Sequence, residues 1–218
     1  MTHTEFYRGL ATAQRALADS SASGATPAPA ELARAVHAAV QPLLDATAMA
    51  SSGARACGAG CTACCHFPVG VTFAEAELLA RELADRPDVA AQLRSTAEAT
   101  ASTPWPRLAG LRCPLLDAGR CAAYDARPLP CRALASADAT ACDRALTARV
   151  PVPRDDEAFA IGLGATTALG AGAVNRAGDA EPDTRELRAA VAALLALDTA
   201  DALPRRAAFE RARPAMPE

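Results

Sequence analysis

The sequence predicts a mainly α-helical protein, with a helical domain around a compact cysteine-rich loop and a short hairpin. Alanine supplies 59 of the 218 residues and aromatic residues only 4%, which favours closely packed helices over a β-sandwich. The length allows one domain with helical extensions. We expect N-terminal helices in residues 1–52, a cysteine-cluster domain in residues 53–150, and C-terminal helices in residues 151–218 that pack on it.

The N-terminal segment predicts two helices joined by a linker. Residues 4–18 form the first helix, and residues 20–30, which are small, uncharged and proline-containing, form a mobile linker. The second helix begins at Pro29, and its apolar residues from Leu32 to Leu44 recur at helical spacing. We expect Pro42 to kink or split this helix.

The middle segment contains start and stop signals for two further helices. Thr72 and Glu75 match a capping box that opens a helix over residues 73–85. A helix over about 88–100 follows, and the Pro-Trp-Pro sequence at 104–106 predicts an extended turn.

Residues 113–124 predict two short extended arms around a tight Asp-Ala-Gly turn at 117–119. We expect Pro128 and Pro130 to keep the approach to Cys131 extended. Helices then resume over about 133–149, about 155–175 and Pro182–Leu197, the last with Pro182 in its first turn.

Seven cysteines lie within 75 residues: Cys57, Cys61, Cys64, Cys65, Cys113, Cys121 and Cys131. The N-terminus does not resemble a signal peptide, and no apolar stretch is long enough to span a membrane. We therefore expect a cytoplasmic protein, in which clustered cysteines more often hold metal than form disulfides.

Thiolates are soft ligands that select zinc, copper(I) or iron–sulfur clusters. Three cysteines in close succession with a distant fourth are a common way to hold a cubane cluster, and Gly58 and Gly60 allow the backbone to wrap around it. The expected cluster ligands are Cys57, Cys61, Cys64 and Cys131, with Cys65, Cys113 and Cys121 as a second half-site. Cys142 is expected to be a buried thiol.

Other polar residues near the cysteines have two interpretations each. Arg127 and Arg132 could offset thiolate charge or bind an anionic substrate, or could pair with Asp117, Asp125 or Glu75. Tyr124 could hydrogen-bond a cysteine sulfur or close the small core beneath the hairpin. His66 could complete a site or lie on the loop surface, whereas His3 and His37 are expected to be exposed.

Several function classes are disfavoured. A net charge of −3 shows no electrostatic footprint for nucleic acid, and the absence of lysine excludes Schiff-base chemistry. The glycines of Gly162–Gly172 lack the strand and spacing of a dinucleotide fingerprint, so we expect them to permit close helix contact.

The pattern as a whole resembles the YkgJ-type cysteine-cluster family, described as zinc- or iron-chelating domains, and the flagellin lysine N-methylases carry a similar signature. The first gap, Cys57-x3-Cys61, is longer than the two residues of many members, and Cys142 has no counterpart. The matching residues are Cys57, Cys61, Cys64, Cys65, Thr72, Glu75, Cys113, Pro114, Leu116, Asp117, Gly119, Cys121, Tyr124, Arg127, Pro128, Cys131 and Arg132.

This resemblance implies a bound metal, with a 4Fe–4S iron–sulfur cluster favoured and zinc as the alternative. The cluster would serve electron transfer, metal handling or a structural role toward a protein partner. An alternative is a cluster-dependent enzyme, such as a methyltransferase that uses S-adenosylmethionine. A third interpretation is a zinc-stapled interaction module.

Overall fold

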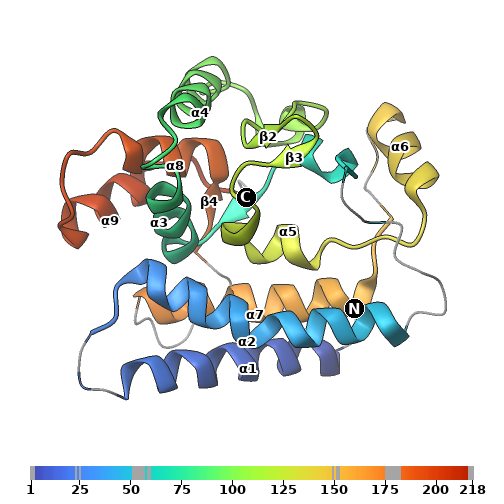
Figure 1. Cartoon of the computed structure of the whole chain (residues 1–218), viewed down its shortest axis with the longest axis horizontal. Coiled ribbons are helices and arrows are strands. Elements are labelled where there is room, and N and C mark those ends of the chain that lie inside the picture. The colour runs from blue at the N-terminus through green and yellow to red at the C-terminus, as the bar shows by residue number, and fades with distance from the viewer. Residues whose placement is uncertain are drawn as a thin grey trace.

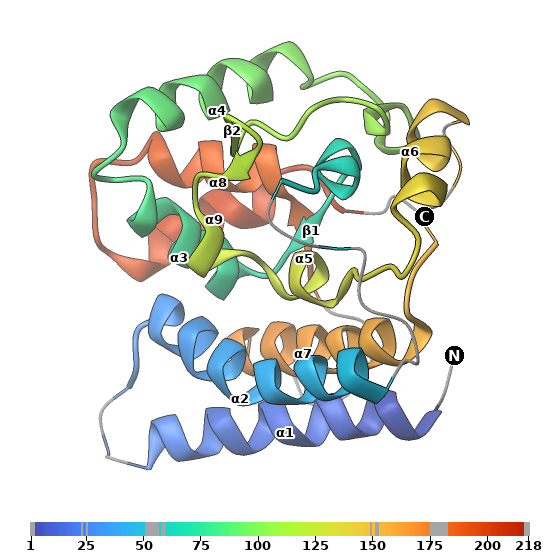
Figure 2. The same ribbon diagram turned by 45° about the vertical axis from the view of Figure 1, so that its right-hand side comes forward.

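A computed structural model describes residues 3–22, 24, 26–50, 57, 60–148, 150, 153–174 and 183–215. Across these ranges the chain forms nine α-helices and four two-residue strands, which confirms the mainly helical class. Figure 1 and Figure 2 show one layer made of three long helices, with the remaining elements stacked on it. The three are α1 (His3–Ser21), α2 (Pro29–Ala50) and α7 (Asp156–Val174).

Glycine allows α1 and α7 to approach each other at backbone distance. A Cβ atom on Gly164 would lie 2.0 Å from the carbonyl oxygen of Phe6, and one on Gly9 would lie 2.1 Å from that of Ile161. Such contacts are possible only without a side chain. Both glycines therefore serve close helix packing, and for Gly164 this is the interpretation that the sequence favoured.

Helix α2 runs through Pro42 without being split. Its apolar stripe is confirmed, because Val36, Val40 and Leu44 are fully buried. Since α1 ends at Ser21 and α2 begins at Pro29, the segment between the helices is shorter than the expected linker.

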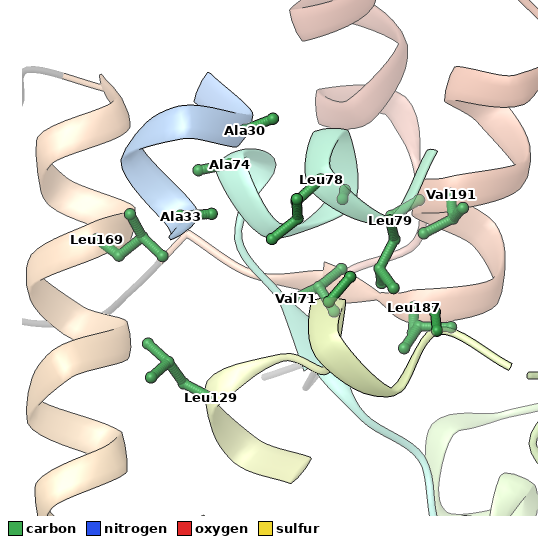
Figure 3. Close-up of a cluster of buried hydrophobic side chains, with 14 of the residues drawn as sticks. Ala30, Ala33, Val71, Ala74, Leu78, Leu79, Leu129, Leu169, Leu187 and Val191 are labelled. Atoms are coloured by element: carbon green, nitrogen blue, oxygen red, sulfur yellow. The ribbon is translucent and has the colours of Figure 1, made fainter. Parts of the chain in front are cut away.

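The second layer contains α3 (Phe73–Glu82), α4 (Pro87–Ala99), α8 (Leu187–Leu195) and α9 (Ala202–Arg211). Strand β1 (Gly70–Val71) pairs antiparallel with β4 (Arg185–Glu186). Figure 3 shows side chains of α2, α3, the helix α5 (Leu129–Ala133), α7 and α8 packed into one core. Because residues 185–186 are in β4, α8 begins later than predicted, and Pro182 lies outside the described residues. Helix α9 was not predicted.

The capping box at the start of α3 is confirmed. The Thr72 hydroxyl accepts a hydrogen bond from the Glu75 N–H at 3.3 Å, and the Glu75 carboxylate accepts one from the Thr72 N–H at 2.9 Å. Helix α4 lies close to its predicted bounds. The predicted extended turn at 104–106 is wrong, because Trp105–Leu108 form a 3₁₀ helix after the extended Pro104.

Helix α6 (Ala139–Ala148) begins six residues after the predicted start. The Asp138 carboxylate accepts a hydrogen bond from the Ala141 N–H at 2.8 Å, which caps the helix at this point. Within the described segments, no helix combines the length and apolar character needed to cross a membrane.

Candidate metal centre

The predicted hairpin is present and carries Cys121. Strand β2 (Leu116–Asp117) pairs with β3 (Arg120–Cys121), so that Leu116 faces Cys121 across the ladder. The two turn residues have positive φ, 43° at Ala118 and 78° at Gly119, as a type I′ turn requires. The hairpin therefore fixes how Cys121 is presented.

A short 3₁₀ helix, η1 (Ala63–His66), brings Cys64 and Cys65 to the loop before the hairpin. The Cys113 N–H donates to the Cys65 carbonyl at 2.7 Å, and the Gly110 N–H donates to the His66 carbonyl at 2.7 Å. These backbone bonds hold the vicinal cysteines beside Cys113, although the two segments are far apart in sequence.

Cys131 lies in the short helix α5, so the predicted extended approach to it is wrong. Pro128 is extended with ψ 157°, but Pro130 occupies the first helical turn. The N–H groups of a first turn have no partner inside the helix, so proline is tolerated there. The Leu129 N–H is instead bound by the Glu75 carboxylate at 2.7 Å, and this contact joins the starts of α3 and α5.

His37 is buried, with 4% exposure, so the expectation that it is exposed is wrong. Its Nε2 lies 3.4 Å from the Glu75 carboxylate. Burial acts to raise the pKa of Glu75, but hydrogen bonds from His37, Thr72 and Leu129 together with the His37 charge lower it below its usual range. His37 lies next to Val36 on the buried stripe of α2, and this position was the signal that could have revealed it.

The thiols from these segments form one neighbourhood. Burial raises the pKa of Cys131, and negative charge on the nearby sulfurs of Cys113, Cys64 or Cys121 would raise it further. Burial also raises the pKa of Cys121 and of Cys113, and each is affected by the charge of another thiolate in the group. The site thus assembles thiols from η1, the hairpin and α5, and all of these thiols are free.

The vicinal pair is asymmetric. A hydrogen bond from the Cys65 thiol lowers the pKa of Cys64 to about 7, with a further contribution from the Arg127 charge. The same hydrogen bond, together with burial, raises the pKa of Cys65. Of these two thiols, Cys64 is therefore the one that more readily becomes a thiolate donor.

Cys57 interacts with a different part of the chain. Its sulfur accepts a hydrogen bond from the Ser136 N–H at 3.2 Å. Burial raises the pKa of Cys57, and the charges of Cys61, Cys64 and Cys142 oppose its ionisation as well. Cys142 is buried on α6, as expected. Cys64 is thus a neighbour of Cys57 as well as of Cys131. The predicted ranking of the metal ligands stays a prediction.

The hydrogen bonds that the structure gives for Arg127 and Arg132 go mainly to backbone carbonyl oxygens and not to the expected carboxylates. Arg132 donates to the carbonyl oxygens of Arg127 and Asp125 and to the Gln41 side chain. The Arg127 guanidinium stacks on the ring of Tyr124 at 3.5 Å and donates to the Tyr124 carbonyl. Tyr124 is 58% exposed, so it does not close a core beneath the hairpin.

His66 is half-buried on η1. Its Nδ1 lies 3.0 Å from the carbonyl oxygen of Thr62. If Nδ1 carries the proton for this bond, Nε2 is left as the nitrogen that could accept a metal ion.

The donor set fits a soft metal, because its members are free thiols and the surrounding cations can stabilise thiolates. In the described parts of the chain, no three His, Cys, Asp or Glu side chains are already arranged to hold a metal ion. Binding would therefore require the thiols to turn toward one another.

The described structure is thus a cysteine-rich domain with helices packed around it. Residues 56–149 match the sequence model of the CxxCxxCC family, described as "Putative zinc- or iron-chelating domain". This match confirms the resemblance of residues 56–149 to the YkgJ-type family. Neither the curated proteins nor the solved structures contain a significant match to the chain.

Proposed function

We propose that this domain carries an iron–sulfur centre, with a 4Fe–4S cluster favoured, for electron transfer, metal handling or a structural role in the cytoplasm. The observation that supports the proposal is the gathering of Cys64, Cys65, Cys113, Cys121 and Cys131 as free, half-buried thiols. Their number is sufficient for the four cysteine ligands of one 4Fe–4S cluster, and also for the four ligands of one structural zinc ion. Iron–sulfur clusters are held by such thiolates.

The chain's own residues support thiolate donors in three ways. Arg127 places positive charge near Cys64 and Cys121, and Arg86 adds to it at Cys121. The Leu115 N–H donates to the Cys113 sulfur. Because burial raises most of the thiol pKa values, these thiols hold their protons in the metal-free protein and must release them when metal binds.

Zinc is the second candidate, because the description of the family names it and the same soft donors suit it. A zinc site would be a structural staple for an interaction module, without redox activity.

The test is anaerobic purification followed by quantification of iron, acid-labile sulfide and zinc. Iron and sulfide in equal amounts, with a visible absorption band, would support the cluster. Zinc without sulfide, in a colourless protein, would support the staple, and a protein that binds neither metal would refute both.

Two serine variants sharpen this test. Cys131→Ser removes a thiol that has Cys64, Cys113 and Cys121 as neighbours, and it should abolish metal binding. Cys142→Ser removes a buried thiol on α6 and should leave the metal content unchanged. Equal loss of metal in both variants would show that the ligands are not the proposed ones.

A further inference from the structure

A buried arginine outside the family domain lies against the segment that leads into Cys113. Arg188 belongs to α8 and is only 2% exposed. One of its terminal nitrogens donates to the Glu186 carboxylate at 2.9 Å, and the other lies 3.3 Å from the carbonyl oxygen of Leu111 and 3.5 Å from that of Arg112. An arginine is almost never buried this completely unless it is paired, and Arg188 has its partner in Glu186.

The backbone that Arg188 holds is already tied to η1 on its other side. Gly110 and Cys113 donate their N–H groups to the carbonyls of His66 and Cys65. Residues 110–113 are therefore fixed between η1 and the Arg188 guanidinium. Cys113 is the last residue of this segment, so the position of its sulfur depends on both contacts.

Positive charge is in excess around this junction. Glu186 is fully buried and contacts two guanidinium groups, those of Arg188 and of Arg213. The Nε atoms of both arginines are buried and have no hydrogen-bond partner among the described residues. One carboxylate thus faces two cations, and a nearby anionic thiolate centre would offset the remaining charge.

We propose that Arg188 is a positioning residue of the metal centre, which holds the backbone at Leu111 and Arg112 and so sets the place of Cys113. This inference rests on the proposed function. It means that residues 56–149 depend on a contact from helix α8, which lies outside this domain.

Arg205 provides a matched control. Its guanidinium binds the Glu77 carboxylate at 2.7 and 3.0 Å and donates to the carbonyls of Leu194 and Thr199. It therefore makes the same kinds of contact as Arg188, at a place where no cysteine segment is involved. Arg188→Met and Arg205→Met should both destabilise the metal-free protein. Arg205→Met leaves the buried Glu77 carboxylate without its cation, and Arg188→Met leaves Glu186 with only the Arg213 guanidinium and removes the donor to the Leu111 and Arg112 carbonyls.

Only Arg188→Met should weaken zinc binding, by about 10- to 100-fold, in a competition titration with a chelator under reducing conditions. Arg188→Lys keeps the charge and should recover part of the affinity, and it also serves as the test if the methionine variant does not fold. The proposal would be overturned if Arg188→Met and Arg205→Met bound zinc with equal affinity. If Arg188→Met does not fold, equal zinc affinities of Arg188→Lys and Arg205→Met would overturn it instead.

Hydrogen exchange in the metal-free proteins separates this inference from the proposed function. The amides of Gly110 and Cys113 should exchange faster in Arg188→Met than in wild type or Arg205→Met. If wild type binds no metal, the proposed function fails, while faster exchange would still support the positioning of this segment. Unchanged exchange at both amides would overturn the positioning itself.

Discussion

Replacing Glu75 by glutamine should lower the free energy of unfolding of the metal-free protein by about 3–5 kcal/mol. The carboxylate is fully buried and accepts hydrogen bonds from four donors, two on each oxygen. The glutamine amide nitrogen cannot accept, so two of the four donors lose their partner. At about 1.5–3 kcal/mol for each hydrogen bond to a charged group, this loss agrees with the cost of breaking a buried ion pair.

Urea unfolding of the reduced, metal-free protein would measure the effect. Glu31→Gln is the control, because Glu31 is exposed and accepts a hydrogen bond from the Ala28 N–H at 3.0 Å at the start of α2. The control should change the unfolding free energy by no more than about 0.5 kcal/mol. If Glu75→Gln behaves like the control, Glu75 does not join α2, α3 and α5 as the structure indicates.

Wild type and Glu75→Gln also test how the contribution of the Glu75 carboxylate to stability depends on pH. Because the pKa of Glu75 is lowered in the folded protein, its contribution to stability is present above the unfolded-state value of about 4.3. The contribution is lost as the pH falls further, through the folded-state pKa. The stability difference between wild type and Glu75→Gln should therefore shrink as the pH falls below about 4.3. A difference that grows on acidification would contradict this sign.

Three further predictions follow from the packing, the turn and the thiols. Gly164→Ala should lower the unfolding free energy by about 1–3 kcal/mol, because its Cβ atom would collide with the backbone of α1. If thermal unfolding showed that the variant is more stable than wild type, as helix propensity alone would make it, the close contact would be contradicted. Ala118→Gly should stabilise the protein by about 1 kcal/mol, since Ala118 has φ 43°, and an unchanged denaturation midpoint would contradict the left-handed turn. Zinc affinity should rise with pH, because the raised pKa values of Cys113, Cys121 and Cys131 make protons compete with the metal; a pH-independent affinity in a competition titration would show that these thiols are not ligands.

Local chemistry in the sequence was enough to predict the elements whose signals lie within a few residues of one another. The capping box of Thr72 and Glu75 fixes the start of α3 through bonds between neighbours. The Ala118–Gly119 turn closes the hairpin, because only its own backbone must adopt positive φ. The cysteine spacing likewise indicated the family and the class of ligand, since both depend on residue type and order.

Contacts between distant segments were decided only by the tertiary structure. His37 is buried because α2 packs on α3 and brings its ring to Glu75. Arg188 reaches the loop before Cys113 across about 76 residues of sequence. The grouping of Cys131 with Cys64 and Cys113 depends on the positions that α5 and η1 take in the folded chain. Spacing along the chain restricts which thiols can share a short loop, but the packing of the helices around the core determines which thiols meet.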